Sequence, residues 1–276
     1  MNITSTALRR AGLAAGAIAM LAAAPMLVRT VRAQDPYGEK AGRQVKGGPI
    51  EDLTNRPVHP PRGEGPVTYL FTGKEGDLAA NWVNQGGQPA KWPVAHGAMT
   101  SRGGNIMTRE RYRDYRLHVE FKVPYMPDKT GQARGNSGVF MQGRYEVQVL
   151  DSFGVPHPGK GECGALYNIK APLTNACKPP LQWQTYDIIY RAPRGDESTG
   201  SVSVPGSLTV LQNGIVVQAG TPIDKLTGGA IDKNMLNPGP ILLQDHGNAM
   251  QYRNIWIVPL PETTPDYYED PAPRKL

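Results

Sequence analysis

One segment of the chain alternates strictly between apolar and polar residues, and this constrains the fold more than any other feature. From Tyr115 to Val123 the odd positions are aliphatic or aromatic, and the even positions are Arg, His, Glu and Lys. A period of two predicts a β-strand with one face in a core and one face toward solvent. Helical periods are scarce beyond the N-terminus and Gly and Pro are abundant, so we expect an all-β chain with many turns.

Further short strands are expected along the chain, with no alternation of strands and helices. They are residues 68–71, 139–141, 144–151, 183–190, 208–218, 241–246 and 251–258. Asn213-Gly214 predicts a type I′ hairpin turn within residues 208–218. The last two strands are expected to pair around Gly247-Asn248, and Gly73 to Trp82 is expected to be turns. Two packed antiparallel sheets with jelly-roll connections are the natural architecture.

Residues 135–154 (GNSGVFMQGRYEVQVLDSFG) predict a hairpin with polar groups on its second arm. Gln142-Gly143 is expected to form the tight turn, because glycine adopts positive φ without steric cost. In the second arm, Glu146 and Gln148 share the face opposite the apolar residues. This row predicts either a binding face or an edge strand whose polar face is solvated.

Asp151 falls out of phase with that polar row. One bulged residue at Val149 or Leu150 would return it to the face of Glu146. The result, E-x-Q-x-x-D, is similar to the E-x-D-x-x-E of laminarinase- and lichenase-type jelly-roll glucanases, in which two carboxylates flank the glycosidic bond. The middle acid of that motif is replaced by Gln148, so the double displacement of those enzymes is not implied.

The N-terminus has the features of an export signal over residues 1–33. A basic pair, Arg9-Arg10, precedes an Ala-rich apolar run, and cleavage is expected ahead of Gln34 or, alternatively, after Ala24. An uncleaved membrane anchor is disfavoured because the run is short. The paired arginines leave both the general secretory and the twin-arginine routes open. A periplasmic or secreted protein is expected, with no stable membrane insertion after cleavage.

Removal of residues 1–33 takes away four arginines and no acids, so the net charge falls from +6 to +2. No basic cluster remains that would predict a nucleic-acid partner. Residues 34–66 are rich in Gly, Pro and charge and are expected to form an arm, residues 67–260 the domain, and residues 261–276 a tail. The oligomeric state is left open.

The two cysteines, Cys163 and Cys177, lie in a long segment between predicted strands, residues 152–178. In an exported chain an even pair is expected to form a disulfide. Long loops in compact domains are commonly functional. Tyr167 and Asn168 are therefore candidates for contacts with a ligand.

Three separated stretches resemble one known family. They are NSGVFMQGRYEVQVLDSFG, CGALYNIKAPLTNACKPPLQWQTYDI and LQDHGNAMQYRNIWI. Together they resemble the 3-keto-disaccharide hydrolase domain family, over about Val67 to Leu260. The resemblance implies a concanavalin A-like jelly roll of two curved antiparallel sheets. It also implies action on sugars oxidised at carbon 3, with cleavage by elimination and then hydration, and metal dependence in some members.

A ketone at C3 acidifies the proton on C2, so such a site needs a base, an oxyanion stabiliser and an acid for the leaving group. We expect Glu146 to be the base or a metal ligand, Asp151 the second carboxylate and His246 a proton carrier or metal ligand. A divalent ion held by these three would polarise the ketone. The expected substrate-binding residues are Arg144, Gln148, Tyr167 and Gln244, with His118 and Glu120 as wall residues if their sheet is the concave one; otherwise these two face water.

Two other functions are compatible with the same sequence. A carbohydrate-binding module without catalysis would share the fold, because fold alone does not decide function. A conventional glycoside hydrolase would need two carboxylates across one groove, and Glu120 with Glu146 is the available pair.

Overall fold

Residues 66–261 are described by the computed structural model, and they form a sandwich of two antiparallel sheets. The predicted leader (residues 1–33), nearly all of the predicted arm and of the predicted tail lie outside these residues. Among the residues described, no helix is long and apolar enough to cross a membrane. The expected all-β jelly roll is confirmed, because every pairing between strands is antiparallel and the chain repeatedly crosses between the sheets.

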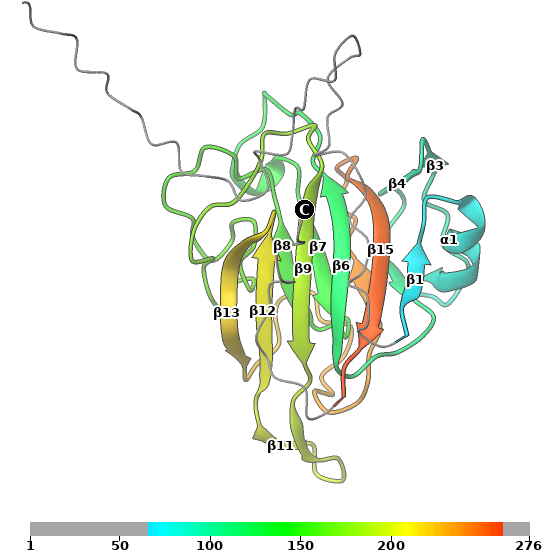
Figure 1. The fold of residues 1–276 in the computed structure, drawn as a ribbon, viewed down its shortest axis with the longest axis vertical. Helices are drawn as coiled ribbons and strands as arrows, with labels where there is room; N and C mark the ends of the chain where they lie inside the picture. The colour runs from blue at the N-terminus through cyan, green and yellow to red at the C-terminus, as the bar shows by residue number, and fades with distance from the viewer. Residues whose placement is uncertain (1–65, 262–276) are drawn as a thin grey trace, which may run out of the picture. The chain divides into compact units, whose positions relative to one another are not determined.

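The larger sheet has eight strands, and Figure 1 shows its central members side by side. In spatial order they are β13 (Ile215–Ile223), β12 (Gly206–Gln212), β9 (Gln184–Arg191), β6 (Tyr115–Lys122), β15 (Gln251–Pro259), β4 (Ala98–Thr100) and β3 (Val94–Ala95), with β1 (Thr68–Phe71) also paired to β15.

The smaller sheet has five strands, and its β7 and β8 lie behind the larger sheet in Figure 1. Its order is β2 (Trp82–Asn84), β5 (Ile106–Thr108), β14 (Leu242–Leu243), β7 (Ser137–Met141) and β8 (Tyr145–Val149). The remaining elements are α1 (Glu75–Asn81), the 3₁₀ turn η2 (Gly131–Ala133) and the ribbon of β10 (Arg194–Asp196) and β11 (Ser201–Val204).

The core lies between the two sheets and takes alternate residues from each strand. From β6 the buried core contains the apolar set predicted by the alternation, Tyr115, Leu117, Val119 and Phe121. From β8 it contains Tyr145, Val147 and Val149. The ring of Tyr145 packs 6.0 Å from that of Tyr190 on β9, which joins the sheets directly. The residues between these core positions therefore face away from the core, on opposite sides of the sandwich.

Both predicted hairpin turns are confirmed. Gln142 and Gly143 have φ angles of 53° and 66°, and the N–H of Arg144 donates to the carbonyl of Met141 at 3.0 Å. Asn213 and Gly214 have φ angles of 54° and 81°. Two successive positive φ values match the right-handed twist of the flanking strands, which is why the sequence signal is strong.

Two predictions of local structure are wrong. The strand at 241–246 does not pair with the strand at 251–258: β14 pairs with β5 and β7 in the smaller sheet, and β15 belongs to the larger one. The chain between them crosses from one sheet to the other. A local turn sequence does not predict which sheet the next strand joins. The expected turns before Trp82 are replaced by α1, whose Leu78 is buried against the core.

The predicted disulfide is also not formed, since Cys163 and Cys177 are free thiols. The Nε2 of Gln212 donates to both sulfurs, at 3.4 Å for Cys163 and 3.2 Å for Cys177. The sulfur of Cys163 lies 3.1 Å from the Tyr186 hydroxyl. The pair therefore fills a buried site against the larger sheet as hydrogen-bonded thiols, and it does so without a covalent staple.

Gly143 provides a direct test of the β7–β8 turn. A Cβ there would lie 2.6 Å from Cδ1 of Ile231, in addition to the strain of positive φ. Gly143→Ala is therefore expected to lower the free energy of unfolding by about 2–3 kcal/mol in urea denaturation. Gly200→Ala is the matched control, because its φ is 74° and its Cβ would meet nothing within 4 Å. Equal losses in the two variants would show that the contact with Ile231 is unimportant.

Candidate functional site

Glu146 lies in the middle of β8 and faces outward from the smaller sheet, as the alternation predicted. Its side chain is nevertheless only 3% exposed. The carboxyl lies over the backbone of Gly138 on β7: a Cβ at that position would be 2.5 Å from Oε1 of Glu146. The space for the carboxyl thus exists because residue 138 has no side chain.

The carboxyl of Glu146 has no hydrogen-bond or ion-pair partner among residues 66–261. Burial raises its pKa from 4.5 to about 8, because the charged form is poorly solvated there. A buried acid without a partner lowers the stability of a fold. Perturbed titratable groups of this kind are concentrated in functional sites.

The outer edge of β8 is closed by the long segment that follows it. The N–H of Tyr167 donates to the carbonyl of Glu146 at 3.0 Å, and the N–H of Gln148 donates to the carbonyl of Ala165 at 3.0 Å. Thr227 adds a third attachment, since its Oγ1 accepts from the N–H of Glu146 at 2.9 Å. These bonds bring Tyr167, a predicted binding residue, next to Glu146.

The ring of Tyr167 lies between two glycines. A Cβ on Gly161 would be 3.8 Å from one ring edge, and a Cβ on Gly228 would be 3.9 Å from the other. The two glycines therefore pack on opposite edges of the ring at ordinary contact distance. Tyr167 is half-buried, so its accessible surface can contact a bound molecule.

Gln148 continues the polar row next to Glu146, as predicted. Its Nε2 donates to Oε1 of Gln132 at 2.9 Å and to the carbonyl of Gly161 at 3.2 Å. Its Oε1 is buried and has no hydrogen-bond partner within the described chain. An unpaired buried acceptor of this kind can receive a hydrogen bond from a ligand hydroxyl.

Asp151 also returns to this side of the sheet. Val149 and Leu150 both belong to the core, so the alternation breaks at the predicted position. The ladder ends at Val149, and the break is therefore the end of the strand and not a bulge inside it. The carboxylate of Asp151 forms an ion pair with Nε of Arg134 at 3.1 Å and accepts from the N–H of Phe153 at 3.3 Å.

The loop after β14 approaches the site from the other side. The N–H of Gln244 donates to the carbonyl of Gly138 at 3.0 Å, which places Gln244 beside the strand residue under the Glu146 carboxyl. His246 is two residues further along, and its side chain is exposed. In the same loop, Oδ1 of Asn248 accepts from the N–H of Asn136 at 2.8 Å.

The predicted metal ligands do not form a set. Within residues 66–261 no group of three or more His, Cys, Asp or Glu side chains could hold a metal ion. Asp151 is engaged with Arg134, His246 is exposed in another loop, and Glu146 has no second carboxylate or imidazole bonded to it. Within the described residues these three side chains therefore do not form a ready-made site for a divalent ion.

Arg144, a predicted substrate-binding residue, is a structural residue. Its side chain is 1% exposed and forms two bonds to the carboxylate of Asp232, at 2.6 and 3.0 Å. It also donates to the carbonyl of Asn237 at 2.8 Å. Arg144 thus fastens the loop that carries Thr227 to the turn between β7 and β8, and it does not point to an open site.

His118 and Glu120 lie on the outer face of the larger sheet and not beside Glu146. His118 is bonded to Asp187 at 2.6 Å and stacks on Trp256 at 4.9 Å, while Glu120 accepts from Arg253 at 2.6 Å. Burial opposes the charge of His118, but the Asp187 carboxylate outweighs it and raises the pKa to about 9. The prediction that these two residues line the same groove as Glu146 is wrong, because the whole sandwich separates them.

Sequence reasoning missed three residues that shape the site. Gln132 bonds Gln148, Asn136 bonds both Gln132 and Asn248, and Thr227 bonds Glu146. Gln132 and Asn136 come from the Gly-rich loop before β7, whose composition predicts only irregular structure. Their proximity to the hairpin in sequence was a usable signal, whereas Thr227 is more than 80 residues from Glu146 along the chain and gave none.

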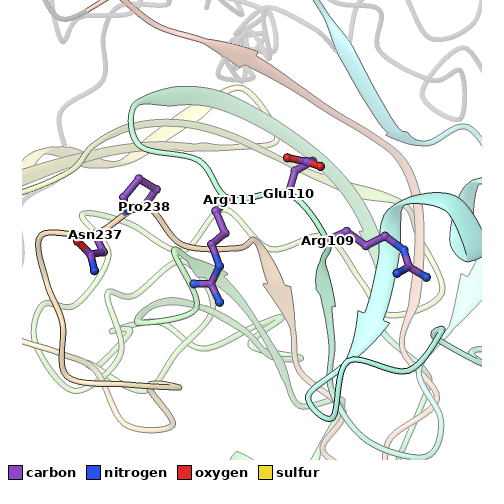
Figure 2. Close-up of a pocket in the computed structure, with 5 residues that line it drawn as sticks. All are labelled: Arg109, Glu110, Arg111, Asn237 and Pro238. Atoms are coloured by element: carbon purple, nitrogen blue, oxygen red, sulfur yellow. The ribbon is translucent and has the colours of Figure 1, made fainter.

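A separate open pocket of about 590 Å³ is lined by Arg109, Glu110, Arg111, Asn237 and Pro238. Figure 2 shows that the side chains of Arg109 and Arg111 extend in different directions and that Glu110 points away from Arg111. No charged groups converge there, so the surroundings of Glu146 are the better candidate for chemistry.

The fold is a β-sandwich of two antiparallel sheets, and the family match assigns it to a carbohydrate-active class. The model of the 3-keto-alpha-glucoside-1,2-lyase-like domain matches residues 66–258, and the chain belongs to this family. Among solved structures, a candidate glycosyl hydrolase from Parabacteroides distasonis is 39% identical, with a TM-score of 0.64, over 70% of this chain and 84% of that one.

A second candidate glycosyl hydrolase from the same organism is 20% identical, with a TM-score of 0.52, and covers 71% of this chain and 94% of its own. At that identity it supports the fold alone. No curated protein matches the chain. The expected family is therefore confirmed, and the chain is a carbohydrate-active domain of that family.

The burial of Glu146 predicts a stability change whose size depends on pH. At about pH 3 the carboxyl is largely neutral in the folded and unfolded chain, so Glu146→Gln should change little. At about pH 9 it is ionised in both states, and the folded state bears a cost of roughly 3–5 kcal/mol for the buried charge. The variant is therefore expected to be more stable than the parent near pH 9 in urea denaturation. Exposed Glu110→Gln is the control, and equal effects at both pH values would contradict the buried charge.

Proposed function

We propose that the domain cleaves 3-keto-glycosides, with Glu146 as the base that removes the proton from C2. The electron pair of that C–H bond forms the enolate of the C3 ketone, and the bond between C1 and the leaving group then breaks. Water adds to the resulting enone-like product. The observation that supports this proposal is the buried carboxyl of Glu146, which has no partner within residues 66–261 and whose pKa is raised by burial to about 8.

A carbon acid beside a ketone is a weak acid, so a base that is more basic than an ordinary carboxylate removes its proton more readily. The raised pKa of Glu146 meets this need at neutral to slightly alkaline pH. The same carboxyl, once protonated, can return the proton to the departing oxygen. Gln148 supports binding, because its unpaired Oε1 can accept from a sugar hydroxyl. Tyr167 and Gln244 flank the same position.

A conventional two-carboxylate hydrolysis is disfavoured by the surroundings of Glu146. Glu120 lies across the sandwich and is bonded to Arg253, and Asp151 is bonded to Arg134. Neither carboxylate faces Glu146 across one bound sugar, as retaining and inverting enzymes require. Elimination needs only one base, so it is the reaction compatible with a single free carboxyl.

A binding module without catalysis is the second candidate. It would use the same row of Glu146, Gln148 and Tyr167 to hold a sugar. The raised pKa of Glu146 argues for catalysis, because a hydrogen-bonding carboxylate serves binding best when it is solvated or paired.

The first test compares a 3-keto-glucoside carrying a chromogenic leaving group with the unoxidised parent glucoside. Release is expected from the keto substrate alone, and Glu146→Gln should lower kcat/KM by at least about a hundredfold. For the parent protein, kcat/KM should rise with pH and level off above about 8. A parallel assay with a chelator tests the predicted metal dependence.

Other outcomes of this assay are equally informative. Release from the unoxidised glucoside would favour a conventional hydrolase. Release from neither substrate, together with measurable binding of the sugar, would favour the binding module. Full activity in Glu146→Gln would remove Glu146 from the mechanism.

Gly138 tests whether the position of the carboxyl matters. Gly138→Ala places a methyl group within 2.5 Å of Oε1 of Glu146, so the carboxyl must move. We expect kcat to fall by about ten- to a hundredfold, because catalysis depends on the geometry of the base. Gly159→Ala is the control, since its Cβ would meet nothing within 4 Å. Unchanged kcat in the Gly138 variant would contradict the assigned role.

We further propose that the mature protein acts in the periplasm or outside the cell, on the basis of the signal-like residues 1–33. Sequencing the N-terminus of the exported protein tests this, with Gln34 as the expected first residue. A protein that retains Met1 and stays in the cytoplasm would contradict it.

A further inference from the structure

A cleft of about 370 Å³ lies at the end of β8, beyond the position of Glu146. It is lined by Tyr125, Met126, Pro127, Arg134, Asp151, Phe153, Pro179 and Pro180. Three separate segments contribute: the loop after β6, the end of β8 and the turn before β9. The cleft is thus built by distant parts of the chain.

The walls of the cleft are aromatic and exposed. Tyr125 is 62% exposed and Phe153 is 48% exposed, so neither ring is needed to fill the core. Proline rings complete the lining, and they present flat, rigid apolar surfaces. Exposed aromatic residues around a concave surface are typical of a binding site, since they offer large contact area at low entropic cost.

The cleft is connected to the Glu146 site by paired side chains. Arg134 at its base is bonded to Asp151, and Gln132, two residues earlier in the same loop, is bonded to Gln148 beside Glu146. β8 ends at Val149, and the N–H of Ser152 donates to the carbonyl of Leu150, so the chain turns at Asp151 just past the strand that carries Glu146. A sugar ring held at Glu146 would therefore leave the cleft for the group attached to C1.

We propose that this cleft binds the leaving group of the glycoside and that its preferred leaving group is a phenolic ring. The inference rests on the proposed function of Glu146. When the bond from C1 to the phenolic oxygen breaks, its electron pair stays on that oxygen, which is then protonated. The released phenol leaves through the open end of the cleft.

A second sugar fits the lining less well than an aromatic ring. Sugar hydroxyls need several donors and acceptors, and the polar side chains of the cleft are Arg134, Asp151 and Tyr125. Both oxygens of Asp151 already have partners, Arg134 and the N–H of Phe153. A flat ring can instead stack on Tyr125 or Phe153 and contact the prolines.

The test uses two substrates that share the 3-keto-glucosyl part, one with a phenyl and one with a methyl leaving group. Phe153→Ala and Tyr125→Ala are each expected to raise KM for the phenyl substrate roughly three- to tenfold, with the methyl substrate unchanged. Tyr69→Ala is the matched control, because this tyrosine is 46% exposed on β1 and lies outside the cleft. Equal effects on both substrates, or no effect on either, would overturn the proposal.

A binding measurement separates this proposal from that of the proposed function. Saturation-transfer NMR with unoxidised phenyl glucoside should show contact of the phenyl protons, weakened in both cleft variants and retained in the Tyr69 control. This measurement needs no turnover, so it shows whether the cleft binds the phenyl ring even if neither keto substrate is cleaved. If a 3-keto-disaccharide loses affinity in the variants while the phenyl substrate does not, the cleft binds a sugar and the phenolic assignment is wrong.

Discussion

The burial of one carboxyl, that of Glu146, costs stability, and the packing around it must offset that cost. Glu146 is held on the outer face of the smaller sheet and buried, and its carboxyl has no hydrogen-bond or ion-pair partner in the described chain. An unpaired buried acid costs stability, so the surrounding scaffold must be strong enough to impose it. The bare backbone of Gly138 provides the space, and the segments that carry Tyr167 and Thr227 fix the strand on which Glu146 sits.

The scaffold gains that strength from the opposite face of the same strand. Tyr145 packs against Tyr190 of the larger sheet, and the Tyr186 hydroxyl donates to the carbonyl of Gln148 at 2.5 Å. Successive residues of β8 therefore face the core and the candidate site in turn. Because the core fixes the register, a shift of one residue would bury Glu146 between the sheets and is strongly disfavoured. The core packing that fixes the register of β8 therefore also fixes the face on which Glu146 and Gln148 lie.

Much of this arrangement could be predicted from local sequence, and the part that could not is long-range. The alternation in residues 115–123 and the turn at Gln142-Gly143 are short-range signals, and both are confirmed. The period of two shows that a strand has a polar face, but it does not show where that face lies in a two-sheet sandwich. For this reason the sequence grouped His118 with Glu146, although they lie on opposite sides. For the same reason the sequence could not predict that β14 and β15 lie in different sheets.

The two outer faces differ in how their acidic groups are paired, and this difference supports the proposed site. On the larger sheet His118 is paired with Asp187 and Glu120 with Arg253, an arrangement of charges that stabilise one another. On the smaller sheet Glu146 is unpaired and the Oε1 of Gln148 lacks a donor within the described chain. Buried polar groups that serve only the fold are normally satisfied within it. A ligand would complete the bonds of these two neighbouring groups, which supports the proposal that the smaller sheet carries the site.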